Sequence, residues 1–171
     1  IDLGVVPTPA VAYLVGKYKA HAGIMISASH NTFDFNGIKI FNEYGYKLED
    51  ELEERIESIV LDGTPTPKLA SPENIGSVTR AANAVKDYVD HLVSSVHCSL
   101  DGMNIAVDCA NGSASKTAEQ LFTRLGANAA ILSSAPNGTN INDGCGSTHL
   151  ENLKAYVVEH GLDAGIAYDG D

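Results

Sequence analysis

The chain has 171 residues, with 22 acidic against 11 basic side chains and a formal net charge of −11. This balance excludes a nucleic acid or an anionic membrane surface as the partner, because both need a basic footprint. Hydrophobic residues make up 44% and aromatic residues only 6%, which favours the aliphatic, Ala-rich core of one large or two small α/β domains.

The first half of the chain contains four expected elements. They are a helix at 8–19, a buried strand at 23–28, a second strand at 37–41 and an acidic amphipathic helix at 49–60. Thr8 is a suitable N-cap for the first helix, and Pro9 follows at the first helical position. The polar residues 29–36 are therefore predicted to form a loop between the two strands.

The second half alternates strands and helices after a Pro-rich linker at 62–72. The expected helices are 81–96, 114–125 and 149–159, and the expected strands are 104–109, 128–132 and 163–168. This rhythm predicts parallel pairing with helices on the sheet faces. The fold class is α/β: two three-layer α/β/α units with mixed, mainly parallel sheets, the first one incomplete. We place the domains at 1–79 and 80–171.

Ser29 is the first candidate for chemistry, because it follows a predicted strand, at the end where ligands bind in open α/β sheets. A serine hydroxyl is a weak nucleophile and needs a base, a metal or a strong local field. Lys39 interrupts an apolar strand, so it must face solvent or a site, where it can move a proton or pair with phosphate. His30 could orient the serine, bind phosphate or satisfy a loop carbonyl. A plain turn remains the alternative for the whole loop.

Asp169 and Asp171 form the second candidate site. Two carboxylates at a spacing of two, directly after an apolar strand, can converge on one hard divalent cation, and Mg²⁺ prefers such oxygen ligands. The pair is equally typical of a turn that ends a strand. The Gly-rich polar segment 140–149 is of the kind that often carries function.

Together these motifs resemble the α-D-phosphohexomutases. The segment 23–31 with Asn36-Gly37-Ile38-Lys39 resembles their phosphoserine loop, and Asp169-Gly170-Asp171 resembles the start of their metal loop. The closest resemblance within this superfamily is to the bacterial phosphoglucosamine mutases. The features that indicate this branch are Ser27-Ala28 before Ser29, the run 36–41 and the run 140–149.

The resemblance implies a role for each site residue. Ser29 would carry a phosphoryl group, His30 would stabilise the phosphoserine, and Lys39 would move a proton to or from the sugar oxygen. Mg²⁺ would be held by Asp169, Asp171, a phospho-Ser29 oxygen and a third Asp beyond the end of the chain. Thr32 and Leu150 stand where relatives commonly have Pro, which affects loop rigidity without removing a reactive group.

The resemblance also implies a reaction and a setting. The full-length enzyme would interconvert glucosamine 6-phosphate and glucosamine 1-phosphate through a bisphosphate, for UDP-N-acetylglucosamine and cell-wall precursor synthesis. We expect a cytoplasmic protein with a hexosamine phosphate substrate and neither nucleic acid nor membrane as partner. A homodimer is one option for the full-length protein, whose oligomeric state the sequence does not determine. The three separated cysteines, Cys98, Cys109 and Cys145, also favour a reducing compartment.

The same resemblance implies that the chain is a fragment. It would hold the end of the first of four domains and nearly all of the second, so we expect it to be inactive alone. Three alternatives stay open at this point: a sister mutase for mannose or glucose phosphate, a phosphatase whose nucleophile is Asp169, and a non-catalytic phosphosugar-binding module.

Overall fold

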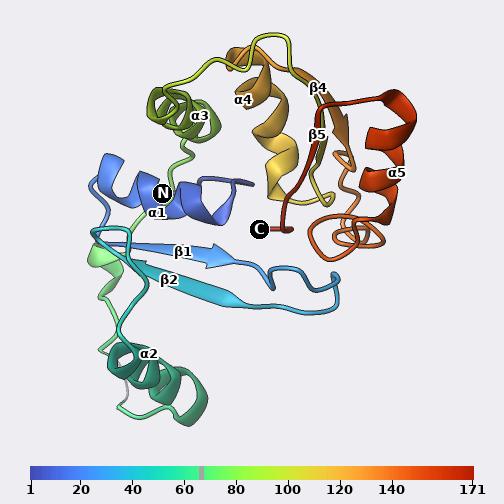
Figure 1. Cartoon of the computed structure of the whole chain (residues 1–171). Helices are drawn as coiled ribbons and strands as arrows, with labels where there is room; N and C mark the ends of the chain where they lie inside the picture. Colours follow the sequence, from blue (N-terminus) through green and yellow to red (C-terminus); the bar gives the residue numbers. More distant parts are fainter. Residues whose placement is uncertain (66–67) are drawn as a thin grey trace.

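The structure, a computed structural model, describes residues 1–65 and 68–171, so Thr66 and Pro67 of the predicted linker lie outside the described residues. The chain forms two units (Figure 1). The first contains α1 (Thr8–Lys17), β1 (Ala22–Ile26), β2 (Ile38–Asn42), α2 (Asp50–Glu57) and the π turn η1 (Ser58–Asp62). The 3₁₀ turn η2 (Pro72–Asn74) lies in the connection. The second contains α3 (Ala84–Ser95), β3 (Asn104–Asp108), η3 (Ser113–Lys116), α4 (Ala118–Arg124), β4 (Asn128–Leu132), α5 (Glu151–His160) and β5 (Ala164–Ala167).

The second unit is a three-layer α/β/α arrangement. Its sheet has the order β4-β3-β5 with both pairs parallel. Ile105 and Val107 of β3 pack with Phe122 of α4 on one face. On the other face Gly165 of β5 lies against Leu153 of α5. These parallel pairs confirm the predicted α/β class with mainly parallel pairing. A helix that connects two parallel strands has to cross back over one face of the sheet.

The first unit is thinner. β1 and β2 pair antiparallel, and α1 packs on one face. Gly23 allows this close approach, because a Cβ at that position would overlap the Val15 side chain of α1. The prediction of a buried strand is wrong for the opposite face, where Ile24, Ile26 and Ile38 are 62–74% exposed. No described element covers that face, so alternate side chains of each strand meet solvent.

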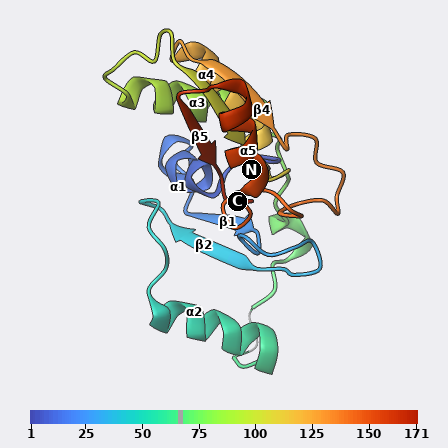
Figure 2. The same cartoon turned by 45° about the vertical axis from the view of Figure 1, so that its right-hand side comes forward.

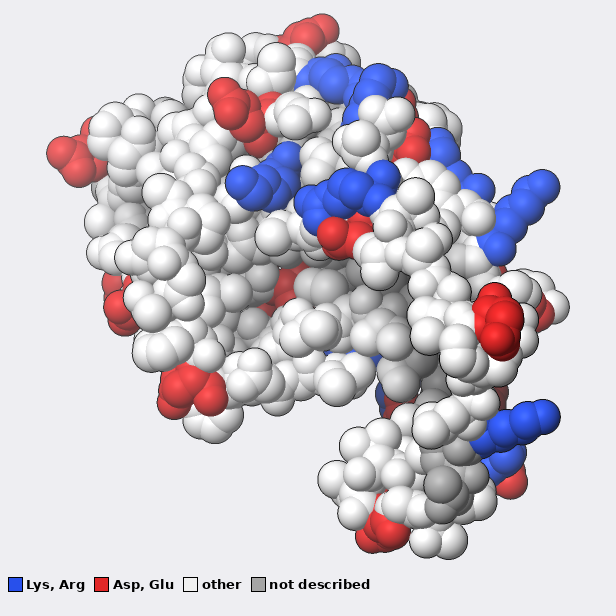
Figure 3. Space-filling view, turned by 180° about the vertical axis from the view of Figure 1, so that it is seen from behind, with Lys and Arg blue, Asp and Glu red and all other residues white. Residues whose placement is uncertain are grey.

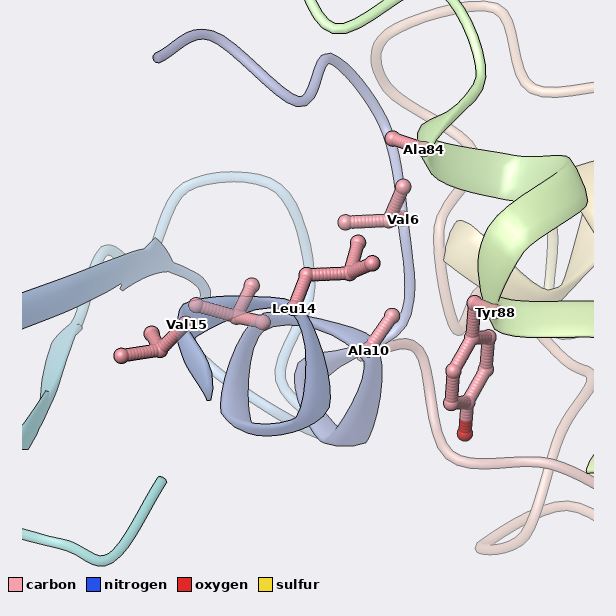
Figure 4. Close-up of a cluster of buried hydrophobic side chains, with 7 residues drawn as sticks. Val6, Ala10, Leu14, Val15, Ala84 and Tyr88 are labelled. Atoms are coloured by element: carbon pink, nitrogen blue, oxygen red, sulfur yellow. The ribbon is translucent and has the colours of Figure 1, made fainter. Parts of the chain in front are cut away.

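Helix α3 joins the units. Ala84 and Tyr88 of α3 complete a buried cluster with Val6, Ala10 and Leu14 of the first unit (Figure 4). Burial of a large aliphatic or aromatic side chain of this kind stabilises a fold by about 1.5–3 kcal/mol. The predicted domain boundary at residue 79/80 stays a prediction, although α3, assigned to the second domain, shares its core with the first.

Polar contacts of Tyr18 and Lys17 with Asp87, called the α1–α3 clasp below, add to the apolar contact between these two helices. The Tyr18 hydroxyl donates a hydrogen bond of 2.7 Å to Asp87, and the Lys17 ammonium lies 3.1 Å from the same carboxylate. The hydrogen bond from Tyr18, with help from Lys17, outweighs the effect of burial and holds the pKa of Asp87 below its usual value. Burial and this hydrogen bond raise the pKa of Tyr18 to about 12.

Some predicted helices differ in detail. The helix expected at 114–125 is divided at Thr117 into η3 and α4. Helix α2 lies away from both sheets (Figures 1 and 2). Two apolar residues of the predicted amphipathic helix, Leu52 in α2 and Val60 in η1, are exposed. None of the helices in the described part of the chain has the length and hydrophobicity needed to span a bilayer.

Candidate active site

Ser29 lies in a tight turn just beyond β1. Its backbone has a φ of +60°, a left-handed conformation that is uncommon for a residue other than Gly, Asn or Asp. The Ser29 N–H donates to the Ser27 hydroxyl at 2.9 Å, and the Asn31 N–H donates to the Ala28 carbonyl at 3.2 Å. These bonds close the turn and leave the Ser29 hydroxyl free to point out of the first unit.

The Ser29 hydroxyl meets the carboxylates that follow β5. It donates to Asp169 Oδ2 at 2.9 Å and lies 3.4 Å from Asp171 Oδ1. Asp169 and Asp171 follow Ser29 by 140 and 142 positions in the chain, respectively. The segment that carries the carboxylates is fixed by a 3.0 Å hydrogen bond from the Ser113 N–H to the Gly170 carbonyl. Gly112 has no room for a Cβ, because the Gly170 backbone occupies that space.

Lys39 completes the cluster from β2. Its ammonium pairs with Asp171 Oδ2, which also accepts a 2.8 Å hydrogen bond from the Thr8 hydroxyl. Burial alone would raise the pKa of Asp171, but the hydrogen bonds from Lys39 and Thr8 outweigh it and lower that pKa below its usual value. Asp171 is therefore a carboxylate at neutral pH, and Lys39 balances its charge.

Four of the five predicted site residues thus come together. Ser29, Lys39, Asp169 and Asp171 form one cluster between the units. His30 follows Ser29 in the turn, but its side chain is exposed, and the described residues give it no hydrogen-bond partner.

Sequence reasoning missed two residues of this cluster. Thr8 was predicted as a helix N-cap, but the cap position of α1 is Pro7 and no side chain caps the helix. The Thr8 hydroxyl serves Asp171 instead. Asn142 donates from the loop after β4 to the Ser29 and Asn31 carbonyls. The only signal for Asn142 was its place in the polar segment 140–149, which does not reveal a partner more than 100 residues away.

The cluster has features that fit a hard cation. Asp169 Oδ1 is buried and has no hydrogen-bond partner among residues 1–65 and 68–171. Two carboxylates and a hydroxyl converge there, which is the oxygen-rich set that Mg²⁺ accepts. Within the same ranges, however, no group of three or more acidic, His or Cys side chains is arranged to hold a metal. The described residues therefore bring together oxygen atoms of the kind that a hard cation accepts, without forming a complete cation site.

A large cavity lies beside the cluster. Seen from behind, the molecule is hollowed near its centre, with Lys and Arg side chains along the upper rim (Figure 3). A cavity of about 940 Å³ is bounded by the N-terminal segment, α1 and β1, and reaches Ser29 and Gly170. Many of its lining residues are aliphatic, among them Leu3, Leu14 and Ile26. Polar residues, among them Asn31, Ser113 and Lys116, line the cavity as well. It therefore combines apolar walls with a few polar groups, as small-molecule sites commonly do.

Comparison with known proteins matches both units to one family. Residues 1–66 match the model of phosphoglucomutase/phosphomannomutase α/β/α domain I, and residues 86–171 match that of α/β/α domain II. Phosphoglucosamine mutase of Clostridium novyi is 51% identical over 174 residues, and that of Rhodococcus erythropolis is 51% identical over 171. Both alignments cover 100% of this chain and 38% of the relative, so the chain spans about two fifths of their length.

A solved structure supports the fold. A phosphoglucomutase/phosphomannomutase family protein from Burkholderia thailandensis superposes with a TM-score of 0.80 at 23% identity, over 99% of this chain and 38% of that one. At this identity the likeness speaks for the fold alone. The two family matches together take in all four clustered residues, Ser29 and Lys39 in the first and Asp169 and Asp171 in the second. The chain belongs to the phosphoglucomutase/phosphomannomutase family.

Proposed function

We propose that this chain supplies the nucleophile and part of the cation site of a phosphoglucosamine mutase, which interconverts glucosamine 6-phosphate and glucosamine 1-phosphate. The observation that carries the proposal is the 2.9 Å hydrogen bond between the Ser29 hydroxyl and Asp169. It joins a strand-end serine of one unit to a strand-end carboxylate of the other. The relatives of about 50% identity that match the whole chain support glucosamine phosphate as the substrate.

The proposed reaction has two phosphoryl transfers. In the first, a sugar hydroxyl loses its proton and its oxygen bonds the phosphorus on Ser29, while the bond from that phosphorus to Ser29 Oγ breaks. In the second, the other phosphate of the resulting bisphosphate returns to Ser29, and the sugar oxygen regains a proton. Lys39 is the proposed carrier of that proton, because it pairs with Asp171, which the Ser29 hydroxyl also approaches.

Mg²⁺ is the cation that we propose for the cluster. Asp169 and Asp171 would hold it together with an oxygen on phospho-Ser29 and a carboxylate from outside this chain. Asp169 Oδ1 supports this assignment, since it is buried without a hydrogen-bond partner in the described part of the chain, and such burial of a carboxylate oxygen is costly without a compensating group. When bound, Mg²⁺ would neutralise charge on the transferred phosphoryl group.

A phosphatase that uses Asp169 as its nucleophile fits the geometry less well. Asp169 Oδ1 is buried, and Oδ2 accepts the hydrogen bond of Ser29. An Asp169 nucleophile would have to use the buried Oδ1 or give up the hydrogen bond between Oδ2 and Ser29. A sister mutase for mannose or glucose phosphate would share all of these residues, so only substrate comparison separates it.

Intact mass and kinetics of the full-length protein test the proposal, with Ser29→Ala as the variant and exposed Ser77→Ala as the matched control. Because Ser29 forms the covalent intermediate, we expect its loss to abolish a phosphate-sized mass difference and to lower turnover of glucosamine 6-phosphate at least about 10³-fold. Ser77→Ala should keep both, and mannose 6-phosphate should be the poorer substrate. The 171-residue chain alone should be inactive. Retained turnover in Ser29→Ala would refute the assignment.

A further inference from the structure

Asn142 is a buried polar residue that links the two units. It lies in the loop between β4 and α5, and its side chain is only 3% exposed. Its amide nitrogen donates to the Ser29 carbonyl at 2.9 Å and to the Asn31 carbonyl at 2.8 Å. One side chain of the second unit therefore holds two carbonyls of the turn that carries the nucleophile.

These two bonds use the full donor capacity of the amide. An Asn side chain has one NH₂ group with two hydrogens, and here each hydrogen has its own carbonyl. Because both partners can only accept, the orientation of the amide follows from its contacts. The two acceptors flank His30, so Asn142 spans the residue that has no hydrogen-bond partner of its own among the described residues.

The turn needs such support, because Ser29 is strained. A left-handed conformation is unfavourable for a residue with a Cβ, and it persists only when the surroundings determine it. Three contacts determine it here: Ser27 accepts from the Ser29 N–H, Asn142 donates to its carbonyl, and Asp169 accepts from its hydroxyl. Of these three contacts, the one with Asn142 fixes the carbonyl side of the residue.

Asn142 is itself anchored to the parallel sheet. Its N–H donates to the Ala110 carbonyl at 2.9 Å, and Ala110 lies two residues after the end of β3. The buried carboxylate of Asp108, at the end of β3, accepts 2.9 Å hydrogen bonds from the N–H groups of Ala110 and Gly146. Both ends of the segment around Asn142 are thus fixed to β3, so the amide is held by a rigid element and not by a free loop.

The contact reaches the carboxylates as well. Gly170, between Asp169 and Asp171, is buried against the Asn142 side chain and the Ser29 carbonyl, and a Cβ there would come within 3.0 Å of both. The nucleophile turn, the Asn142 amide and the carboxylate segment therefore pack as one body. We therefore expect a change at Asn142 to alter the distance between the Ser29 hydroxyl and the two carboxylates.

We propose that Asn142 is a positioning residue for phosphoryl transfer, which fixes the Ser29 turn so that its hydroxyl faces Asp169 and Asp171. This inference rests on the proposed function of Ser29. Asn142 touches no reacting atom, so its effect falls on the transfer step and not on substrate binding. A misplacement of about 1 Å can lower the rate of such a step about 10²-fold.

The test compares Asn142→Ala with Asn140→Ala in the full-length protein. Asn140 lies in the same loop and forms its side-chain bonds within that loop, with Ala135 and Asn137, so it is a matched control. We expect Asn142→Ala to lower kcat about 10- to 100-fold with KM within about threefold. Asn140→Ala should keep both values within about threefold. Asn142→Ser, with one donor, should lie between wild type and Ala, and it serves if the Ala variant does not fold.

Hydrogen exchange over residues 28–33 is the second measurement. Exchange should be faster in Asn142→Ala than in Asn140→Ala, because only the first removes support from the turn. An unchanged kcat, or equal losses in both variants, would overturn the role of Asn142 while an inactive Ser29→Ala leaves the proposed function intact. If Ser29→Ala is active, the proposed function fails, and this inference fails with it.

Discussion

The two units differ in how completely their sheets are covered. The second has three parallel strands with α4 on one face and α5 on the other, and its central strand is buried from Ile105 to Asp108. The first has a two-stranded antiparallel sheet with α1 on one face and exposed isoleucines on the other. The nucleophile candidate nevertheless lies on the thinner unit.

The difference shows where the rigidity of the site comes from. The Ser29 turn receives little support from its own sheet, and its hydroxyl and carbonyl are both held by the second unit, through Asp169 and Asn142. Conversely, two side chains of the first unit, Thr8 and Lys39, hold Asp171 of the second unit. The site is therefore a property of the docked pair, since neither unit contains it alone.

The largest expected effect concerns the ion pair that crosses between the units. Lys39→Met keeps the length of the side chain but removes both the proton and the charge that balances Asp171. Loss of a general acid–base group lowers turnover about 10²- to 10⁴-fold. We expect a decrease of this size in kcat of the full-length protein, measured with glucosamine 6-phosphate.

Lys39→Arg is the matched variant for that experiment. It keeps a positive charge beside Asp171 but does not release a proton near neutral pH. We expect the thermal stability of Lys39→Arg to exceed that of Lys39→Met, while both have low turnover. Turnover near the wild-type value in Lys39→Arg would mean that Lys39 acts through charge alone.

A smaller effect compares the two sheets with the same substitution. Ile105 is 2% exposed in β3, and Ile26 is 74% exposed in β1. Ile105→Ala should reduce the free energy of unfolding by about 2–5 kcal/mol, because it leaves a cavity in a covered sheet. Ile26→Ala should change it by less than about 0.5 kcal/mol. Urea denaturation of the 171-residue chain measures both, and equal losses would show that the outer face of β1 is covered in solution.

The smallest expected effect is the pH dependence of the α1–α3 clasp. The pKa of Asp87 is lowered in the folded chain by the Tyr18 hydroxyl and Lys17. Its stabilisation is therefore fully present above the usual Asp value of about 4 and is lost as pH falls through the lowered pKa. Asp87→Asn should cost about 1 kcal/mol at pH 7, with less difference from wild type near pH 3.

Exposed Glu119→Gln is the control for that experiment, since it removes one negative charge without a partner among the described residues. Its free energy of unfolding should follow wild type across the same pH range. A constant difference between Asp87→Asn and wild type from pH 7 to pH 3 would contradict the lowered pKa.

Local sequence patterns predicted an element well where its bounds depend mainly on its own residues. The strand at 128–132 was predicted with the bounds observed, and the helix predicted at 149–159 matches α5 closely. These patterns failed where burial or hydrogen bonding depends on residues elsewhere in the chain. The apolar run at 23–28 looks buried, but its outer face has no covering element among the described residues. Thr8 is a residue type that often caps helices, yet its hydroxyl donates a hydrogen bond to Asp171 instead.

The sequence by itself determined the chemical groups and their local places. Ser29, Asp169 and Asp171 could be named after predicted strands and Lys39 within one, because a strand and the turn that ends it depend on adjacent residues. Only the tertiary structure decided that these groups converge, that His30 faces solvent, and that Asn142 supports the nucleophile turn. Those facts depend on the docking of two units through α3, and contacts over more than 100 residues leave no periodic signal in the chain.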